Sequence, residues 1–84
     1  MRTLATYDRL RAIWELVLDT RDLAPDDDFF YLGGDSLSGL EVIERIHAGF
    51  GVDVPPMAMY DRVNTLAKMT AVIDAELSRS QEGS

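Results

Sequence analysis

Three stretches of this 84-residue chain repeat apolar residues every three or four positions, which is the spacing of one face of an α-helix. They cover residues 5–19, 36–50 and about 65–77. Their apolar stripes are Tyr7, Leu10, Ile13, Trp14, Val17 and Leu18 in the first; Leu40, Ile43, Ile46 or His47, and Phe50 in the second; and Leu66, Met69, Val72, Ile73 and Leu77 in the third. Trp14 is expected to anchor the core, because large aromatic residues at stripe positions usually pack.

The segments between these stretches predict a long loop and one short helix. Pro25 and the aspartates 26–28 disfavour helix, so residues 20–32 are expected to form a loop that Phe29 or Phe30 pins to the core. Residues 56–60 are expected to form one helical turn that begins at a proline. The sequence therefore predicts an all-α bundle of three main helices and a short fourth, with a long loop between helices 1 and 2.

Size and composition indicate one domain. A mass of 9.4 kDa with 46% hydrophobic residues supports one modest core, which we expect over residues 5–77 with a flexible tail at 78–84. There is no cysteine, no apolar membrane span and no signal-peptide pattern, so we expect a cytoplasmic protein. The start at Met1 and the short polar tail suggest a free-standing protein, although a domain excised from a synthetase would look the same.

The net charge of −7 is concentrated in the middle of the chain. Residues 19–53 hold nine of the fifteen acidic residues but, of the eight basic residues, only Arg21 and Arg45. Such a surface repels nucleic acid and anionic lipid and attracts partners with basic patches. We therefore expect no nucleic-acid or membrane partner. A solvated acidic face that only keeps the protein soluble is the alternative.

The residues around Ser36 favour the presentation of a serine hydroxyl. Gly33 and Gly34 permit a tight turn into the second helix. Asp35 is a candidate N-cap, whose carboxylate would accept from the backbone N–H two or three residues further on. Ser36 would then be the first helical residue, in a place where free N–H groups and the helix dipole favour a phosphate.

A catalytic role for Ser36 would need a base. Gly-Asp-Ser-Leu also occurs in a family of serine esterases, in which a distant Asp-x-x-His supplies that base. The only histidine here is His47, about 16 Å of helical rise from Ser36, whereas nucleophilic catalysis needs a base within hydrogen-bond reach. We expect no enzymatic activity. We expect His47 to be a half-buried packing residue, with a role on the helix surface as the alternative. The aspartates 26–28 lack calcium-loop spacing, so a solvated turn is expected there and no metal site.

Four motifs follow one another along the chain: D-x-F-F-x-L-G-G-D-S-L, E-V-I-E-R-I, F-G-V-D-V-P and T-L-A-K-M-T-A-V-I. Together they resemble the carrier-protein family, which comprises the acyl and peptidyl carrier proteins of fatty-acid, polyketide and non-ribosomal peptide synthesis. The resemblance covers residues 7–77. The double glycine and the paired phenylalanines are closer to peptidyl carriers, whereas the acidity and the aspartate before the serine fit both kinds.

The resemblance implies that Ser36 carries covalent 4′-phosphopantetheine, transferred from coenzyme A by a phosphopantetheinyl transferase. Gly34, Asp35 and Leu37 would flank this group, and residues 57–60 would lie beside its arm. The thiol of the arm would hold an acyl or aminoacyl thioester, loaded by an adenylating or acyl-loading enzyme. Condensing, tailoring or thioesterase enzymes would then receive it from the monomeric carrier, in natural-product biosynthesis of the non-ribosomal peptide or polyketide type.

The second helix is the recognition surface that the resemblance implies. The expected partner-binding residues are Leu37, Glu41, Val42, Glu44 and Met59. Val42 enters this set from a helical wheel, and a core position is the alternative for Met59. Two other functions are alternatives to the carrier: an unmodified interaction module on the same fold, and a minimal serine hydrolase.

Overall fold

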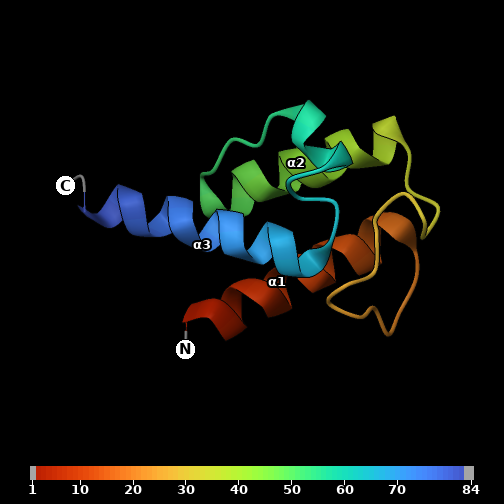
Figure 1. The fold of residues 1–84 in the computed structure, drawn as a ribbon, viewed down its shortest axis with the longest axis horizontal. Helices are drawn as coiled ribbons and strands as arrows, with labels where there is room; N and C mark the ends of the chain where they lie inside the picture. The colour runs from red at the N-terminus through yellow and green to blue at the C-terminus, as the bar shows by residue number, and fades with distance from the viewer. Residues whose placement is uncertain (1, 83–84) are drawn as a thin grey trace.

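The computed structural model describes residues 2–82 and confirms the all-α prediction (Figure 1). Its elements are α1 (Arg2–Leu18), α2 (Ser36–Phe50), the 3₁₀ helix η1 (Pro56–Tyr60) and α3 (Leu66–Glu82). Across residues 2–82 the only β-type pairing is an isolated antiparallel bridge between Asp28 and Thr65. No helix in this range is long and apolar enough to cross a membrane.

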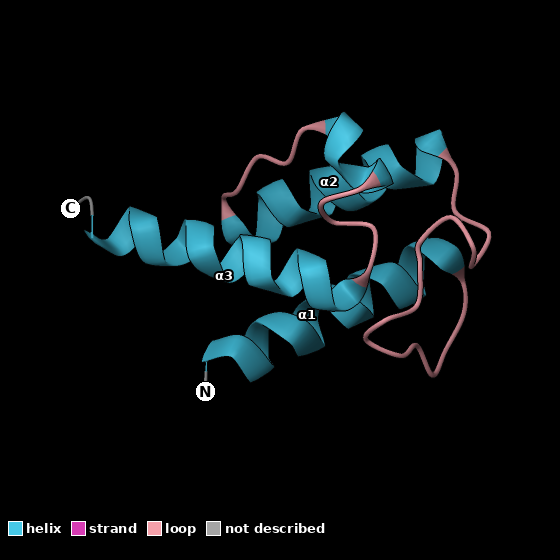
Figure 2. Ribbon diagram, in the orientation of Figure 1, coloured by secondary structure: helices cyan, strands magenta, loops and turns pink. Residues whose placement is uncertain are grey.

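The helices form a small bundle in which α1 packs against both α3 and α2, and η1 packs on α2. Figure 2 shows the long loop that joins the end of α1 to the start of α2 at one end of the bundle. The molecule measures 38 × 25 × 21 Å, with a radius of gyration of 12.0 Å. That radius is the value expected of one compact domain of this length.

Two aromatic residues form the centre of the core. Trp14 and Phe29 are both fully buried, with ring centroids 5.1 Å apart in an edge-to-face arrangement. The indole Nε1–H of Trp14 donates to the Sδ of Met69 at 3.2 Å, so Trp14 joins α1 to the loop and to α3. The predictions of Trp14 as a core anchor and of a phenylalanine pinning the loop are confirmed.

Two predicted helix ends are wrong. α1 begins at Arg2 instead of residue 5, and α3 continues to Glu82 instead of ending at Leu77. No glycine or proline interrupts residues 78–82, and Arg79 pairs with Glu76 one turn earlier at 2.9 Å. The predicted flexible tail is therefore helical over 78–82, and Gly83 and Ser84 lie outside the described residues.

The buried face of α2 differs from the predicted stripe by one position. Gly39, Val42 and Ile46 are buried, whereas Leu40 is 45% exposed. A Cβ placed on Gly39 would lie 3.8 Å from both Met59 and Phe29, so these side chains pack on the helix at the glycine. This contact turns the 39–42–46 row inward. Ile43 and Phe50 flank the row and are partly buried.

The predicted stripe position of Val72 is wrong, and of the two interpretations of His47 the surface position is the one observed. His47 is exposed and its Nδ1 lies 2.7 Å from an Asp53 carboxylate oxygen, so it is a surface residue at the end of α2. Val72 is 36% exposed, because the buried row of α3 runs through Leu66, Met69 and Ile73. Gly51 is the C-cap of α2 and lies in the left-handed region, with a φ of 72°.

Candidate functional site

Ser36 is the first residue of α2, and its side chain is exposed. Asp35 is the N-cap: its Oδ1 accepts from the backbone N–H of Ser38 at 2.9 Å, and the Ser38 Oγ accepts from the Asp35 N–H at 2.8 Å. This reciprocal capping box engages Asp35 and Ser38. The predicted cap and the predicted helical position of Ser36 are confirmed.

The two glycines before Asp35 serve different purposes. Gly33 has a φ of +102°, which a side chain would strain. Gly34 is required by packing: a Cβ there would lie 2.3 Å from the Phe29 ring and 2.8 Å from the Phe29 carbonyl oxygen. The turn that leads to Ser36 is thus pressed directly onto a buried core residue.

An apolar groove of about 150 Å³ opens beside Ser36, between α2 and η1. It is lined by Phe30, Ser36, Gly39, Leu40, Ile43, Pro56, Met57, Met59 and Tyr60. The rings of Phe30 and Tyr60 stack at 4.7 Å with an interplanar angle of 7° along it. The sequence did not predict that Phe30 and Leu40 line this groove. Leu40 was expected in the core, and Phe30 was considered only as a residue that pins the loop.

Two of the predicted partner-binding residues are not on the surface. Val42 is fully buried, because it belongs to the inward row of α2, and Met59 is 2% exposed. Met59 packs beside Gly39, which confirms the alternative core position for this residue. The premise that Val42 and Met59 are available to a partner is therefore wrong.

The other three predicted partner-binding residues are exposed. Leu37 is 78% exposed and lies with Glu41 and Glu44 along a shallow depression of α2. Glu41 also pairs with Arg45 at 3.1 Å. Tyr31, at 92%, and Met57 are further exposed apolar side chains on the flanking loop and on η1.

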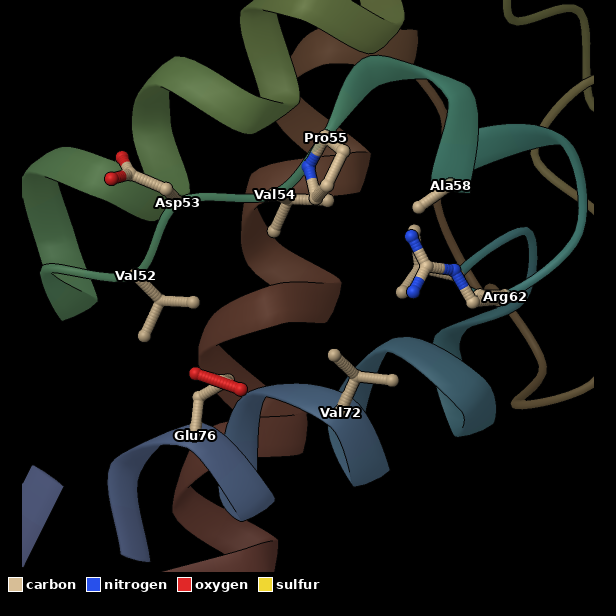
Figure 3. Close-up of a pocket in the computed structure, with 9 residues that line it drawn as sticks. Val52, Asp53, Val54, Pro55, Ala58, Arg62, Val72 and Glu76 are labelled. Carbon is tan, nitrogen blue, oxygen red and sulfur yellow. The ribbon is translucent and has the colours of Figure 1, made fainter. Parts of the chain in front are cut away.

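A separate cleft of about 260 Å³ lies between the segment 52–55 and α3. Figure 3 shows Arg62 and Glu76 on opposite sides of Val72, beneath the Val52–Pro55 segment. No residue of this cleft lines the groove beside Ser36, so the two hollows are distinct. Within residues 2–82 there is also no cluster of three or more carboxylate and histidine side chains that could hold a metal ion.

The aspartates 27 and 28 shape the loop instead. Asp27 Oδ2 accepts from the backbone N–H of Ala24 at 2.9 Å, and Asp28 accepts from two backbone N–H groups and from Asn64. The Asn64 hydrogen bond is the main cause of a lowered pKa of Asp28, and the Ser38 backbone N–H is the main cause of a lowered pKa of Asp35. Both carboxylates are thus stabilised in their ionised form.

These two pKa shifts predict acid sensitivity. Each folded-state pKa is below the ordinary value of 3.8, so the stabilisation is complete above 3.8 and is lost as the pH falls through the lower folded value. We expect the free energy of unfolding to fall as the pH is lowered below 3.8, and to fall less in the Asp28→Asn/Asp35→Asn double variant. Urea titrations at several pH values measure the free energy of unfolding. An equal decrease at low pH in the wild-type chain and the double variant would contradict the prediction.

A small helical bundle that presents an exposed serine at a capped helix N-terminus, beside an apolar groove, has the architecture of a carrier protein. The chain matches the family described as "Phosphopantetheine attachment site" over residues 8–73, and it belongs to that family. It is a phosphopantetheine-binding carrier of the peptidyl type, and its cofactor is 4′-phosphopantetheine attached to a serine. Proteins of this carrier family are not themselves catalytic.

Two much longer biosynthetic proteins are similar to the chain in sequence. The chain is 38% identical over 72 residues, or 83% of its length, to the non-canonical nonribosomal peptide synthetase hkm10 of Aspergillus hancockii. It is 35% identical over 66 residues, or 79% of its length, to tyrocidine synthase 3 of Brevibacillus parabrevis. The chain spans only 7% and 1% of the length of these two proteins.

Solved structures share the fold over most of the chain. BlmI, a type-II acyl carrier protein from Streptomyces verticillus involved in bleomycin biosynthesis, superposes with a TM-score of 0.82 at 26% identity and covers 90% of each chain. An active-site mutant peptidyl carrier protein superposes with a TM-score of 0.82 at 25% identity, over 87% of this chain and 80% of that one. The predicted acyl-carrier-protein-like bundle is confirmed.

Proposed function

We propose that Ser36 is the serine that carries 4′-phosphopantetheine, and that the chain tethers acyl or aminoacyl intermediates as thioesters. The observation that carries this proposal is the contrast between two serines on one helical turn. Ser36 is exposed at the first position of α2, whereas Ser38 is engaged in the capping box with Asp35. When bound, the group supplies a thiol at the end of a long flexible arm.

The local geometry suits a phosphodiester at this serine. The first backbone N–H groups of α2 and its dipole favour an anionic group at residue 36. The groove beside it offers apolar contacts from Leu40, Met57 and Tyr60 to a flexible arm.

The transfer enzyme would supply the base for the reaction. His47 lies eleven residues after Ser36 on α2 and is paired with Asp53. The Asp35 carboxylate accepts from the Ser38 backbone N–H. We therefore propose that the chain has no enzymatic activity of its own and acts as a substrate of other enzymes. A serine hydrolase and an unmodified interaction module both explain the exposed Ser36 at the start of α2 less well than a carrier does.

The relatives suggest the setting. The Aspergillus hancockii protein is a nonribosomal peptide synthetase by name, and BlmI is a carrier involved in bleomycin biosynthesis. By this likeness the partners are a phosphopantetheinyl transferase, an adenylating or acyl-loading enzyme, and condensing, tailoring or thioesterase enzymes. Action as a monomer in the cytoplasm is part of the same proposal.

Intact mass spectrometry tests the proposal. The purified chain is incubated with coenzyme A, Mg²⁺ and a broad-specificity phosphopantetheinyl transferase, and a gain of one phosphopantetheine is expected. Omission of coenzyme A is the control. A folded sample that gains no mass would contradict the carrier function and would leave an unmodified interaction module as the better account.

Leu37→Asp is expected to lower the rate of modification at least about tenfold, because an apolar contact at the centre of an interface commonly contributes that much. Leu37 stands next to Ser36 and is 78% exposed, so the change does not disturb the core. Leu16→Asp is the matched control, since Leu16 is an exposed leucine on α1. Equal rates of transfer for the two variants would show that Leu37 makes no important contact.

A further inference from the structure

The carboxylate of Asp28 joins two parts of the chain that are far apart in sequence. Its Oδ1 accepts from the backbone N–H groups of Phe30 at 2.9 Å and Tyr31 at 3.1 Å. Its Oδ2 accepts from the side-chain amide of Asn64 at 2.6 Å, just before α3. The Phe29 N–H also donates to the Asn64 carbonyl at 2.7 Å, so side chain and backbone join the loop to the same residue.

The same turn continues directly to Ser36. The Leu32 N–H donates to the Asp28 carbonyl at 3.0 Å, and the Gly34 N–H donates to the Phe29 carbonyl at 3.0 Å. Gly34 is followed by the N-cap and then by Ser36. The course of the backbone into Ser36 therefore depends on a turn that Asp28 stabilises in two ways. Its carboxylate accepts from two backbone N–H groups of the turn, and it also binds the Asn64 side chain.

Asp28 does not belong to the acceptor site or to the buried core. It lines neither the groove beside Ser36 nor the cleft beside α3. The start of α3 keeps its own cap, because the Thr65 Oγ1 accepts from the Lys68 N–H at 3.2 Å. The buried residues Trp14 and Phe29 pack through contacts that do not involve the carboxylate. Loss of the Asp28–Asn64 hydrogen bond would thus loosen the turn and leave the bundle intact.

We propose that Asp28 and Asn64 form a latch that positions the loop before Ser36 for modification, with Asp28 as a positioning residue. The proposal rests on the proposed attachment of phosphopantetheine to Ser36. Hydrogen bonds to an ionised carboxylate are among the strongest single contacts available to a surface loop. Without the latch, only a fraction of the molecules presents Ser36 in the geometry that the transferase binds. The apparent KM for the carrier then rises by the inverse of that fraction, whereas kcat stays unchanged.

The test exchanges the two partners without changing their shapes. In Asp28→Asn the new amide faces the Asn64 amide. The oxygen of the Asn64 amide accepts from the Lys68 ammonium at 3.2 Å, which keeps the amide nitrogen directed at residue 28. In Asn64→Asp two carboxylates face each other and repel. The D28N/N64D double variant restores one carboxylate and one amide across the same gap, with the carboxylate beside Lys68.

Phosphopantetheinyl transfer is measured for the four proteins with coenzyme A and a purified transferase, together with hydrogen exchange of the Phe30 and Tyr31 amides. We expect KM to rise about tenfold in each single variant at constant kcat, with faster exchange of the two amides, and both to return toward wild type in D28N/N64D. A merely structural role would lower the free energy of unfolding in the single variants without raising KM while they remain folded. Urea unfolding at neutral pH checks that each variant is folded.

Three outcomes overturn the latch or its premise. Unchanged KM in both single variants overturns the latch, whatever the amides do. A raised KM that the double variant fails to restore overturns the pairing of Asp28 with Asn64. Failure of the wild-type chain to be modified at all overturns the proposed function instead, and this result is distinguishable because it appears before any variant is compared.

Discussion

Replacing Ser36 with alanine is expected to abolish the gain of phosphopantetheine mass and to leave the fold unchanged. The side chain is exposed, and the capping hydrogen bonds of α2 run through Asp35 and Ser38 instead. Alanine is the best helix former, so the free energy of unfolding should change by less than about 0.5 kcal/mol. Intact mass after incubation with coenzyme A and transferase measures the first effect, and urea unfolding measures the second.

Ser38→Ala is the matched control on the same helical turn. It removes the reciprocal hydrogen bond of the capping box, and a hydrogen bond typically contributes about 1 kcal/mol, but it should leave the mass gain in place. Peptide mapping of the modified wild-type chain then assigns the group to one residue. A full mass gain in Ser36→Ala, or loss of the gain in Ser38→Ala alone, would contradict the assignment of the attachment to Ser36.

Phe29→Ala is expected to have the largest effect on stability. The ring is fully buried, meets Trp14 edge-on at 5.1 Å and supports the backbone at Gly34. Truncation of a buried phenylalanine costs about 3–5 kcal/mol. A domain of this size has only about 4–13 kcal/mol of stability in total, so the variant should lose a large part of it. Urea or thermal denaturation followed by circular dichroism measures the loss.

The neighbouring Phe30 gives the comparison. It is only partly buried and stacks on Tyr60 at the groove, so Phe30→Ala should cost less, about 1–2 kcal/mol. The two substitutions remove the same atoms from adjacent positions, but the rings differ in burial and in the aromatic partner that each contacts. If Phe30→Ala were as destabilising as Phe29→Ala, the assignment of Phe29 as the residue that pins the loop would be wrong.

Local rules of sequence were sufficient for the order of the helices and for the cap that precedes Ser36. The Asp35 cap, the helical position of Ser36 and the proline that opens η1 each depend on residues within one turn of each other. The three- and four-residue spacing gave three helices for the same reason. The end of α3 was missed because a polar run without glycine or proline can either continue a helix or fray.

The buried face of α2 could not be predicted from the helix alone. The rows 39–42–46 and 40–43–47 lie next to each other on the helical wheel, and the second contains the larger apolar residues. The first row is buried because Met59 and Phe29, from two other segments, pack against Gly39. A glycine makes no contribution to a hydrophobic stripe, so its role as a contact point is visible only in the tertiary structure.

The connection between Asp28 and Asn64 was invisible for a different reason. The two residues are 36 positions apart, and an aspartate in an acidic run carries no signal that it accepts three hydrogen bonds. The run was correctly expected to be a loop, but it was treated as a solvated turn. The role of Asp28 differs from that of its acidic neighbours only because the folded loop lies beside the start of α3.

The position of Trp14 provides an optical readout of the loop that presents Ser36. It is the only tryptophan of the chain, and its indole touches the ring of Phe29 on one side and the sulfur of Met69 on the other. Undocking of Phe29 would expose one edge of the indole to water and shift its fluorescence emission to longer wavelength. The natural chain therefore contains a label-free reporter of loop docking, suited to stopped-flow measurements while a transferase binds.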